Sequence, residues 1–523
     1  MNENKAVKNL KYLLSGSALS ILSLFVVVGI GFFMQPYMIR TLGDVHYAIW
    51  LLAGTFTGWY AILDFGLNHA VSRFFTKSYS TDDETNCNIY ASTGFYLYIG
   101  LGIIAFLCSL VLSVVAFHFY TEGADGVQLG EGDKSLLAIM IIMTGFSFAW
   151  EFPYRALYGV VLGSLRHDLA GVASIGFRLF GALQTFVILS LGGRLIALGF
   201  ANILIMVLQV YVYYLLAKHS YRSLKITPKN IRKDHAKSLF GYSLYAFIAQ
   251  IGDIIIYSID TVVISKLVSM AAVTHFNIAL TLTNHFKGLL MSSSSWMVSW
   301  LTYLDAQQDR AKILYSMFFG YRFGTYFAGF IAFGLIMWGE PFITRWMGPD
   351  YVDAVSCLVA LVIAATIQAV QEPNIRYLYA TSNHHYFALC NILEGLLKLV
   401  LSLILVSTHG MLGVAMGTLL SCILIRGFVH PLFVCRLLQI NYVMYYLRIG
   451  WYLLMTAAAL MVPYWITTTM VGPTYLKLFT VGILSALSYF PIIYYIGFSV
   501  QDRKMIHGFL FKKNADSEMN NEK

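Results

Sequence analysis

The 523-residue chain has few charged side chains: Asp, Glu, Lys and Arg make up 12% of it, whereas 58% of its residues are hydrophobic. Soluble globular domains carry roughly 25% charged residues. The shortage of charge therefore excludes an ordinary soluble protein. It indicates a polytopic membrane protein, in which long apolar stretches cross the bilayer.

Cysteine is scarce as well. The six cysteines lie far apart, no two of them are separated by two residues, and most fall within apolar stretches. This pattern excludes a disulfide framework and a zinc site. We expect the cysteines to be small core residues, and we expect neither a metal ion nor a cofactor.

Apolar runs of about 20 residues, the length that crosses about 30 Å of hydrocarbon as a helix, recur along the whole sequence. They predict an all-α fold with fourteen transmembrane helices. The predicted spans are residues 14–38, 46–68, 91–118, 135–161, 168–191, 195–217, 241–265, 273–301, 319–339, 352–381, 385–407, 411–435, 449–469 and 475–498.

Positive charge is unevenly distributed about these spans. If the N-terminus is cytoplasmic, the segments on that side hold 22 Lys and Arg residues, whereas the opposite loops hold Arg40, Arg194 and Arg345 and three lysines at span edges. This asymmetry follows the positive-inside rule and places both termini in the cytoplasm. The net charge of +9 then reflects orientation and attraction to anionic lipid, so we expect no nucleic-acid partner.

The sequence also contains a weak internal repeat. The stretch EFPYRALYG from Glu151 recurs as EPNIRYLYA from Glu372, an offset of 221 residues, and two further echoes have offsets of 226 and 220. These echoes predict two pseudo-symmetric six-helix lobes, followed by two extra helices. The predicted parts are an N-terminal lobe at 1–217, a basic cytoplasmic linker at 218–240, a C-terminal lobe at 241–435, helices 13 and 14 at 436–498, and a basic cytoplasmic tail at 499–523.

Several ionisable residues lie inside the predicted spans. Each costs about 2.5–3.5 kcal/mol at a helix centre, so such residues tend to face a protein interior or a wet cavity. From the two halves together, the cations that we predict to bind an anionic ligand are Arg155, Arg178, Lys287, Arg376 and Lys398.

Two interpretations of these cations remain open. In the first, carboxylates four residues away neutralise them on the same helix face, as Glu151 would neutralise Arg155; Glu372 and Glu394 have the same spacing from Arg376 and Lys398. In the second, the cations meet substrate. Arg178 and Lys287 favour this interpretation because neither has a carboxylate three or four residues away.

The acidic residues could instead carry a coupling ion. Asp253 and Asp260 lie seven residues apart and therefore share a helix face, where they would bind H+ or Na+ or bond to neighbouring helices. Glu151, Glu372 and Glu394 are further candidates for ion coupling.

One segment resembles a known family. Residues 42–75, LGDVHYAIWLLAGTFTGWYAILDFGLNHAVSRFF, are similar to the start of the oligosaccharide flippases, the O-antigen and polysaccharide repeat-unit flippases of the multidrug/oligosaccharidyl-lipid/polysaccharide (MOP) superfamily. The shared features are Leu-Gly from Leu42, Asp-x-Gly-Leu from Asp64 and the downstream Arg73. Ala48 departs from the family, which usually has glycine there.

The resemblance implies two lobes around a cavity that opens alternately to each side of the membrane. The implied substrate is an undecaprenyl-diphosphate-linked oligosaccharide, moved across the bacterial inner membrane for O-antigen, capsule or exopolysaccharide synthesis. The five cations above would bind the diphosphate, and Asp64 would be structural. The resemblance further implies a monomeric transporter without catalytic residues that works with a polysaccharide polymerase and chain-length machinery.

Three alternatives compete with this interpretation. A cation-coupled drug or metabolite antiporter of the same superfamily would have an acidic cavity, whereas the intramembrane charge here leans positive. A lipid II flippase would use the same cations. A membrane polymerase or ligase would need a sizeable external domain, and the longest predicted external loop, 119–133, has about fifteen residues.

Overall fold

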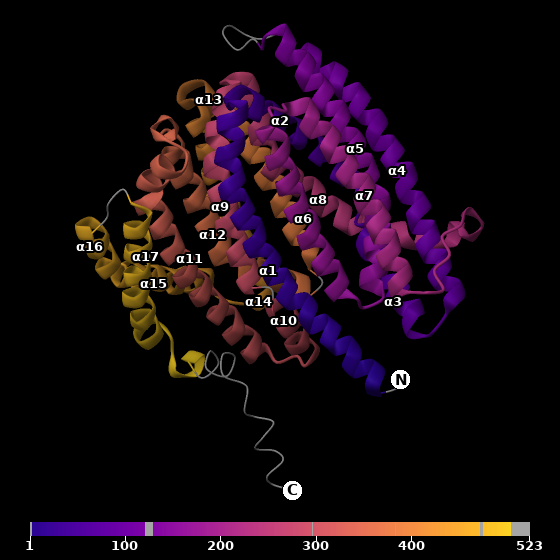
Figure 1. Ribbon diagram of the computed structural model, residues 1–523. Helices are drawn as coiled ribbons and strands as arrows, with labels where there is room; N and C mark the ends of the chain where they lie inside the picture. The colour runs from indigo at the N-terminus through magenta and orange to yellow at the C-terminus, as the bar shows by residue number, and fades with distance from the viewer. Residues whose placement is uncertain (1–2, 121–128, 295, 382, 471–473, 504–523) are drawn as a thin grey trace. The chain divides into compact units, whose positions relative to one another are not determined.

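The computed structural model describes residues 3–120, 129–294, 296–381, 383–470 and 474–503. Within these ranges the chain is helical and contains no β-strand (Figure 1). Helices satisfy every backbone hydrogen bond within one segment, which hydrocarbon requires. The prediction of an all-α polytopic membrane protein is confirmed.

The chain divides into two compact units, Met1–Thr274 and His275–Lys523. The helices that begin in the first unit are α1 (Glu3–Leu42), α2 (Asp44–Gly58), η1 (Trp59–Asp64), α3 (Leu67–Ser80), α4 (Glu84–Phe119), α5 (Glu131–Gly163), α6 (His167–Ser190), α7 (Leu195–Ser220), η2 (Pro228–Asn230), α8 (Lys233–Leu267) and α9 (Met270–Ser294).

The remaining helices all belong to the second unit. They are α10 (Trp296–Ala306), α11 (Arg310–Trp346), η3 (Pro349–Tyr351), α12 (Ala354–Ala380), α13 (His384–Cys422), η4 (Ile423–Val429), α14 (His430–Leu438), α15 (Tyr442–Ala459), α16 (Met461–Met470), α17 (Tyr475–Ile492) and η5 (Ile493–Gly497).

Each predicted span coincides with one of these helices or with a consecutive pair. Among the described residues, eleven segments are long and apolar enough to cross a membrane. The longest, His385–Leu438, has 54 residues and bends at Gly410, where φ is 55° and ψ is −136°. Beyond the bend Gly413 packs on Leu405 and Gly417 packs on Ser402, so the two arms run antiparallel and account for two of the predicted spans.

One helix is central to each unit. In the first unit α5 packs against α2, α3, α4 and α7, and in the second α12 packs against α10, α11 and α13. Both central helices contain an internal proline, Pro153 and Pro373 respectively. The repeated Glu-x-x-x-Arg motif lies beside each proline, so the motif occupies the same kind of position in both units.

Close helix packing follows the same repeat. A Cβ at Gly102 of α4 would lie 2.6 Å from the carbonyl oxygen of Ala149 in α5, and one at Gly324 of α11 would lie 3.0 Å from that of Ala369 in α12. Small residues let helix backbones approach closely. The glycine therefore permits the same contact between α4 and α5 as between α11 and α12.

Helix starts repeat in the same way. Asp83 caps α4 by accepting a hydrogen bond from the backbone N–H of Asn86, and Asp309 caps α11 by accepting one from Lys312. A carboxylate at this position satisfies an otherwise unpaired N–H group. Since the two caps are 226 residues apart, as is one of the sequence echoes, they support a duplicated unit.

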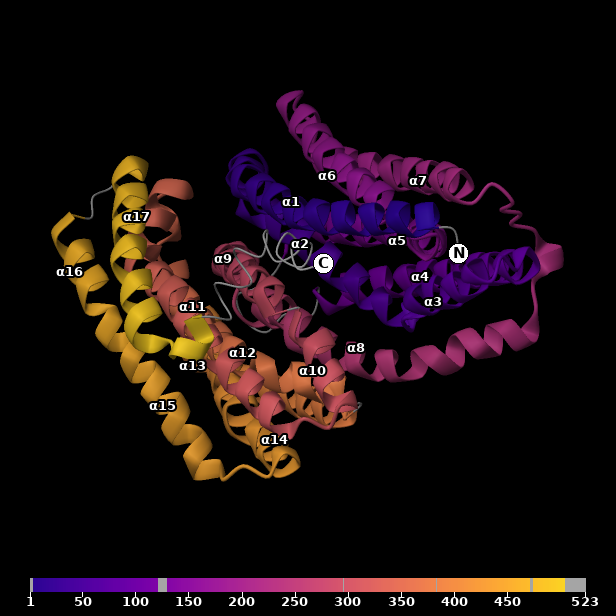
Figure 2. The same ribbon diagram turned by 90° about the horizontal axis from the view of Figure 1, so that it is seen from below.

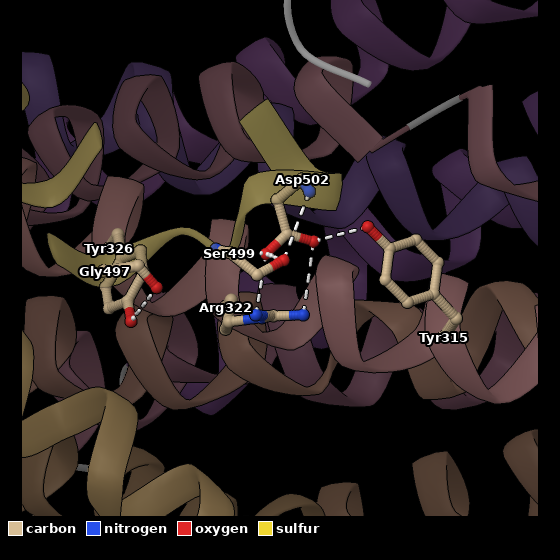
Figure 3. A network of polar contacts seen from close by, with 6 residues as sticks. All are labelled: Tyr315, Arg322, Tyr326, Gly497, Ser499 and Asp502. Carbon is tan, nitrogen blue, oxygen red and sulfur yellow. Dashed lines mark hydrogen bonds and ion pairs between the residues drawn. The ribbon is translucent and has the colours of Figure 1, made fainter. Parts of the chain in front are cut away.

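The last helices pack on the outside of the second unit. Both α15 and α17 contact α11, and α16 pairs with α17 (Figures 1 and 2). The end of the described chain is fixed to α11 by Asp502, which pairs with Arg322 at 2.7 Å and accepts a hydrogen bond from Tyr315 (Figure 3). Asp502 is completely buried, so this contact ties the final helix to the unit.

Candidate functional site

Arg155 of α5 binds two carboxylates. Its Nη2 lies 2.8 Å from Oε1 of Glu151, one turn earlier on the helix, and its Nη1 lies 3.0 Å from Oδ2 of Asp64 at the end of η1. The Tyr98 hydroxyl of α4 donates a short hydrogen bond to the other oxygen of Asp64. The Arg155 side chain is 18% exposed. We call Asp64, Tyr98, Glu151 and Arg155 the Arg155 cluster.

Arg376 of α12 occupies the equivalent place in the second unit. Its Nη2 lies 2.5 Å from Oε1 of Glu372 and 3.5 Å from the hydroxyl of Ser294 at the end of α9. Its side chain is also 18% exposed. Its Nε has no hydrogen-bond partner among the residues that the structure describes. We call Ser294, Glu372 and Arg376 the Arg376 cluster.

The two clusters differ in charge because of one position. Asp64 and Ser294 are 230 residues apart, and the histidine pairs nearby repeat at almost the same offset: His46 lies 3.3 Å from Asp133, and His275 lies 2.7 Å from Asp353. Asp64 and Ser294 are therefore equivalent. The carboxylate gives the Arg155 cluster a net charge of −1, whereas the Arg376 cluster is neutral.

A third charged group is buried in the second unit. Glu394 of α13 pairs with Arg426 of η4 at 2.5 Å, and Arg426 also donates to Asn391 at 3.2 Å. Lys398 lies one turn after Glu394 and is 2% exposed. Lys287 of α9 feels the charges of both Lys398 and Arg426. We call Lys287, Glu394, Lys398 and Arg426 the buried basic group, which holds three cations and one carboxylate.

The other predicted residues lie apart from these groups. Arg178 of α6 is exposed, and it makes no ion pair or hydrogen bond with the residues that the structure describes. Asp260 of α8 is 3% exposed. Asp253 is a helical residue of α8, but its side chain lies outside the described part of the structure.

The geometry thus brings together residues that local spacing pairs and adds others that it does not. The two Glu-Arg pairs form as the four-residue spacing predicts. Sequence reasoning missed the contacts of Asp64 and Ser294 with the arginines, and it missed Arg426 as the partner of Glu394. The repeat itself held the missing signal, because it aligns Asp64 with Ser294.

Comparison with known proteins identifies the family of the chain. Residues 13–298, more than half of the chain, match the model of the family described as polysaccharide biosynthesis protein. The chain is 23% identical over 427 residues to a protein of Haloferax volcanii described as a probable low-salt glycan biosynthesis flippase, Agl15. This match covers 81% of the chain and 83% of the relative.

Solved structures share the fold at low identity. A lipid II flippase, MurJ, in an inward closed conformation matches with a TM-score of 0.68 and 16% identity over 92% of this chain and 98% of its own. An inward-facing multidrug transporter of the MATE family matches with a TM-score of 0.64 and 15% identity over 79% and 98%. The chain thus belongs to the polysaccharide biosynthesis protein family and has the fold of the MOP superfamily of membrane transporters.

Proposed function

We propose that the protein is a flippase that moves a polyprenyl-diphosphate-linked oligosaccharide across the membrane by alternating access. The family match, the flippase relative and the MOP fold support transport of a lipid-linked glycan. The finer statement is that the lipid is undecaprenyl diphosphate and that the glycan is a repeat unit for O-antigen, capsule or exopolysaccharide. In this proposal the membrane is a bacterial inner membrane with both termini of the chain in the cytoplasm.

The Arg376 cluster carries the proposal. Its guanidinium is partly exposed, is balanced by a single carboxylate, and keeps one N–H without a partner among the described residues. Guanidinium groups bind phosphate oxygens through charge-assisted hydrogen bonds. We place Arg376 against the diphosphate and assign Arg155, Arg178 and Lys287 to the same anionic path.

Lys398 has a different place in this scheme. At 2% exposure its ammonium group reaches no ligand in the described arrangement. We propose that it keeps positive charge behind Lys287, and that it meets the diphosphate only when the helices rearrange during transport.

Coupling to an ion rests on the Arg155 cluster. Two carboxylates share one guanidinium there, so one H+ or Na+ would bring the cluster to neutrality. We propose Glu151, 26% exposed against 8% for Asp64, as the ion-binding carboxylate. Glu372, Glu394, Asp253 and Asp260 are secondary candidates, and Glu394 is the weakest because Arg426 already neutralises it.

Genetic deletion tests the function. In the native host, loss of the gene should remove one surface glycan and should leave its lipid-linked repeat unit on the cytoplasmic leaflet. A lipid II flippase would instead stop cell-wall synthesis, and a drug exporter would change only drug sensitivity. Either of these outcomes would reject the proposal.

A further inference from the structure

A groove runs between α11 and α15 in the second unit. One pocket of about 540 Å³ forms its first part and a neighbouring pocket of about 500 Å³ forms the second. Both pockets are lined by Leu314 and Phe318 of α11 and by Leu447 and Arg448 of α15. Arg322 and Trp451 line the first pocket as well. The groove therefore combines two arginines with large apolar side chains.

The two arginines are in different electrostatic states. Arg322 is neutralised by Asp502, to which it donates at 2.7 Å and 3.3 Å. The Asp502 oxygens also accept from the Tyr315 hydroxyl and from the backbone N–H and hydroxyl of Ser499 (Figure 3). Asp502 is thus fully engaged, and it supplies no charge to balance Arg448.

Arg448 retains its positive charge in the groove. Its guanidinium carbon lies 4.3 Å from the centre of the Phe318 ring, and the residue is exposed. Within the described ranges no carboxylate lies at ion-pair distance from it. Stacking on an aromatic face fixes the guanidinium plane and leaves its N–H edges free to donate. A bidentate acceptor such as a phosphate matches these donors.

The position of the groove indicates where the phosphate comes from. Arg448 lies six residues after the first residue of α15, about 9 Å along a helix, on the side that charge asymmetry predicts to be cytoplasmic. Leu447 and Trp451 are 65% and 57% exposed, which suits acyl chains beside a headgroup. Anionic lipids are concentrated in the cytoplasmic leaflet, where basic pockets between transmembrane helices bind their headgroups.

We propose that this groove binds the headgroup phosphate of an anionic phospholipid. Arg448 donates to the phosphate, while Leu447 and Trp451 pack against the first carbons of the acyl chains. Because the groove joins α15 to α11, the bound lipid would stabilise the attachment of the last helices to the second unit. The site is separate from the Arg376 cluster and does not depend on the nature of the transported glycan.

Lipid titration of the purified full-length protein tests this site. The protein in neutral detergent is titrated with phosphatidylglycerol, with phosphatidylcholine or with inorganic phosphate, and bound lipid is measured by native mass spectrometry beside thermal unfolding. We expect phosphatidylglycerol alone to bind and to raise the melting temperature. Arg448→Ala should weaken its binding roughly tenfold, the effect of losing one charge-assisted contact, and Arg448→Lys should weaken it less.

Arg436→Ala is the matched control. Arg436 is an exposed arginine near the end of α14, so this change removes the same charge on the same predicted side but outside both pockets. The control should bind phosphatidylglycerol like the unchanged protein. Equal weakening by Arg436→Ala and Arg448→Ala would overturn the site, as would equal binding of phosphatidylcholine. An equal effect of inorganic phosphate would overturn the assignment to a lipid.

Discussion

Nη1 of Arg155 lies 3.0 Å from Oδ2 of Asp64. In the second unit the equivalent arginine, Arg376, meets the hydroxyl of Ser294 instead. A single carboxylate thus distinguishes two otherwise matching clusters. The difference suggests a division of roles, in which the neutral cluster accepts an anionic substrate and the acidic cluster accepts a cation.

This division predicts the effect of Ser294→Asp. The new carboxylate would give the Arg376 cluster the net charge of its counterpart, so it should repel a diphosphate. We expect glycan export to fall roughly tenfold or more, the equivalent of about 1.4 kcal/mol. Surface glycan at matched membrane protein level measures the effect. Ser294→Ala removes only a hydroxyl and serves as the control. Full export by Ser294→Asp would refute the division of roles.

The pair Glu372 and Arg376 allows a direct choice between a structural and a substrate-binding role. Glu372→Gln and Arg376→Gln each leave an unbalanced charge in the membrane, which costs a few kcal/mol. The double change E372Q/R376Q removes both charges, so it should restore membrane protein level. We expect the double variant to be inserted and folded but inactive in export. Restored glycan in the double variant would mean that Arg376 serves only to neutralise Glu372.

Arg178 should tolerate a change of shape but not a loss of charge. It is exposed on α6, so its removal leaves the packing of the unit nearly intact. Arg178→Lys keeps a cation for the diphosphate and should retain partial export, whereas Arg178→Ala should lose most of it. Export is measured with the melting temperature as a parallel control. Equal export by both variants would remove Arg178 from the anionic path.

Asp502 should affect stability. It is completely buried and binds Arg322, Tyr315 and Ser499. Replacing it by Ala would leave Arg322 without its counter-charge, and breaking a buried pair in this way costs about 3–5 kcal/mol. We expect a lower melting temperature and earlier proteolysis after α17. Asp305→Ala, on an exposed position of α10, is the control, and equal stability of the two variants would contradict the account.

The sequence was informative where interactions are local. Apolar length predicted the helices, and four-residue spacing predicted the pairs Glu151–Arg155 and Glu372–Arg376, because residues one turn apart on a helix are neighbours. It was less informative about contacts between helices. The spacing suggested Lys398 as the partner of Glu394, whereas the structure gives Glu394 a bond to Arg426, 32 residues away.

Contacts between helices depend on how each helix is rotated, which apolar periodicity specifies poorly when most faces are apolar. Asp64 reaches Arg155 because η1 ends beside α5, and no local rule places it there. Asp502 contacts Arg322 across 180 residues for the same reason. The repeat was the one long-range signal, and it could have aligned Asp64 with Ser294 before the structure was known.

Transport by purified protein tests the central claim most directly. Proteoliposomes would contain a polyprenyl-diphosphate oligosaccharide with a fluorescent sugar, and an impermeant quencher would report its appearance on the outer face. We predict that the unchanged protein moves the lipid-linked sugar faster than empty liposomes do, and that Arg376→Ala, reconstituted at equal amount, does not. A rate equal to that of empty liposomes, or an undiminished rate for Arg376→Ala, would contradict the account.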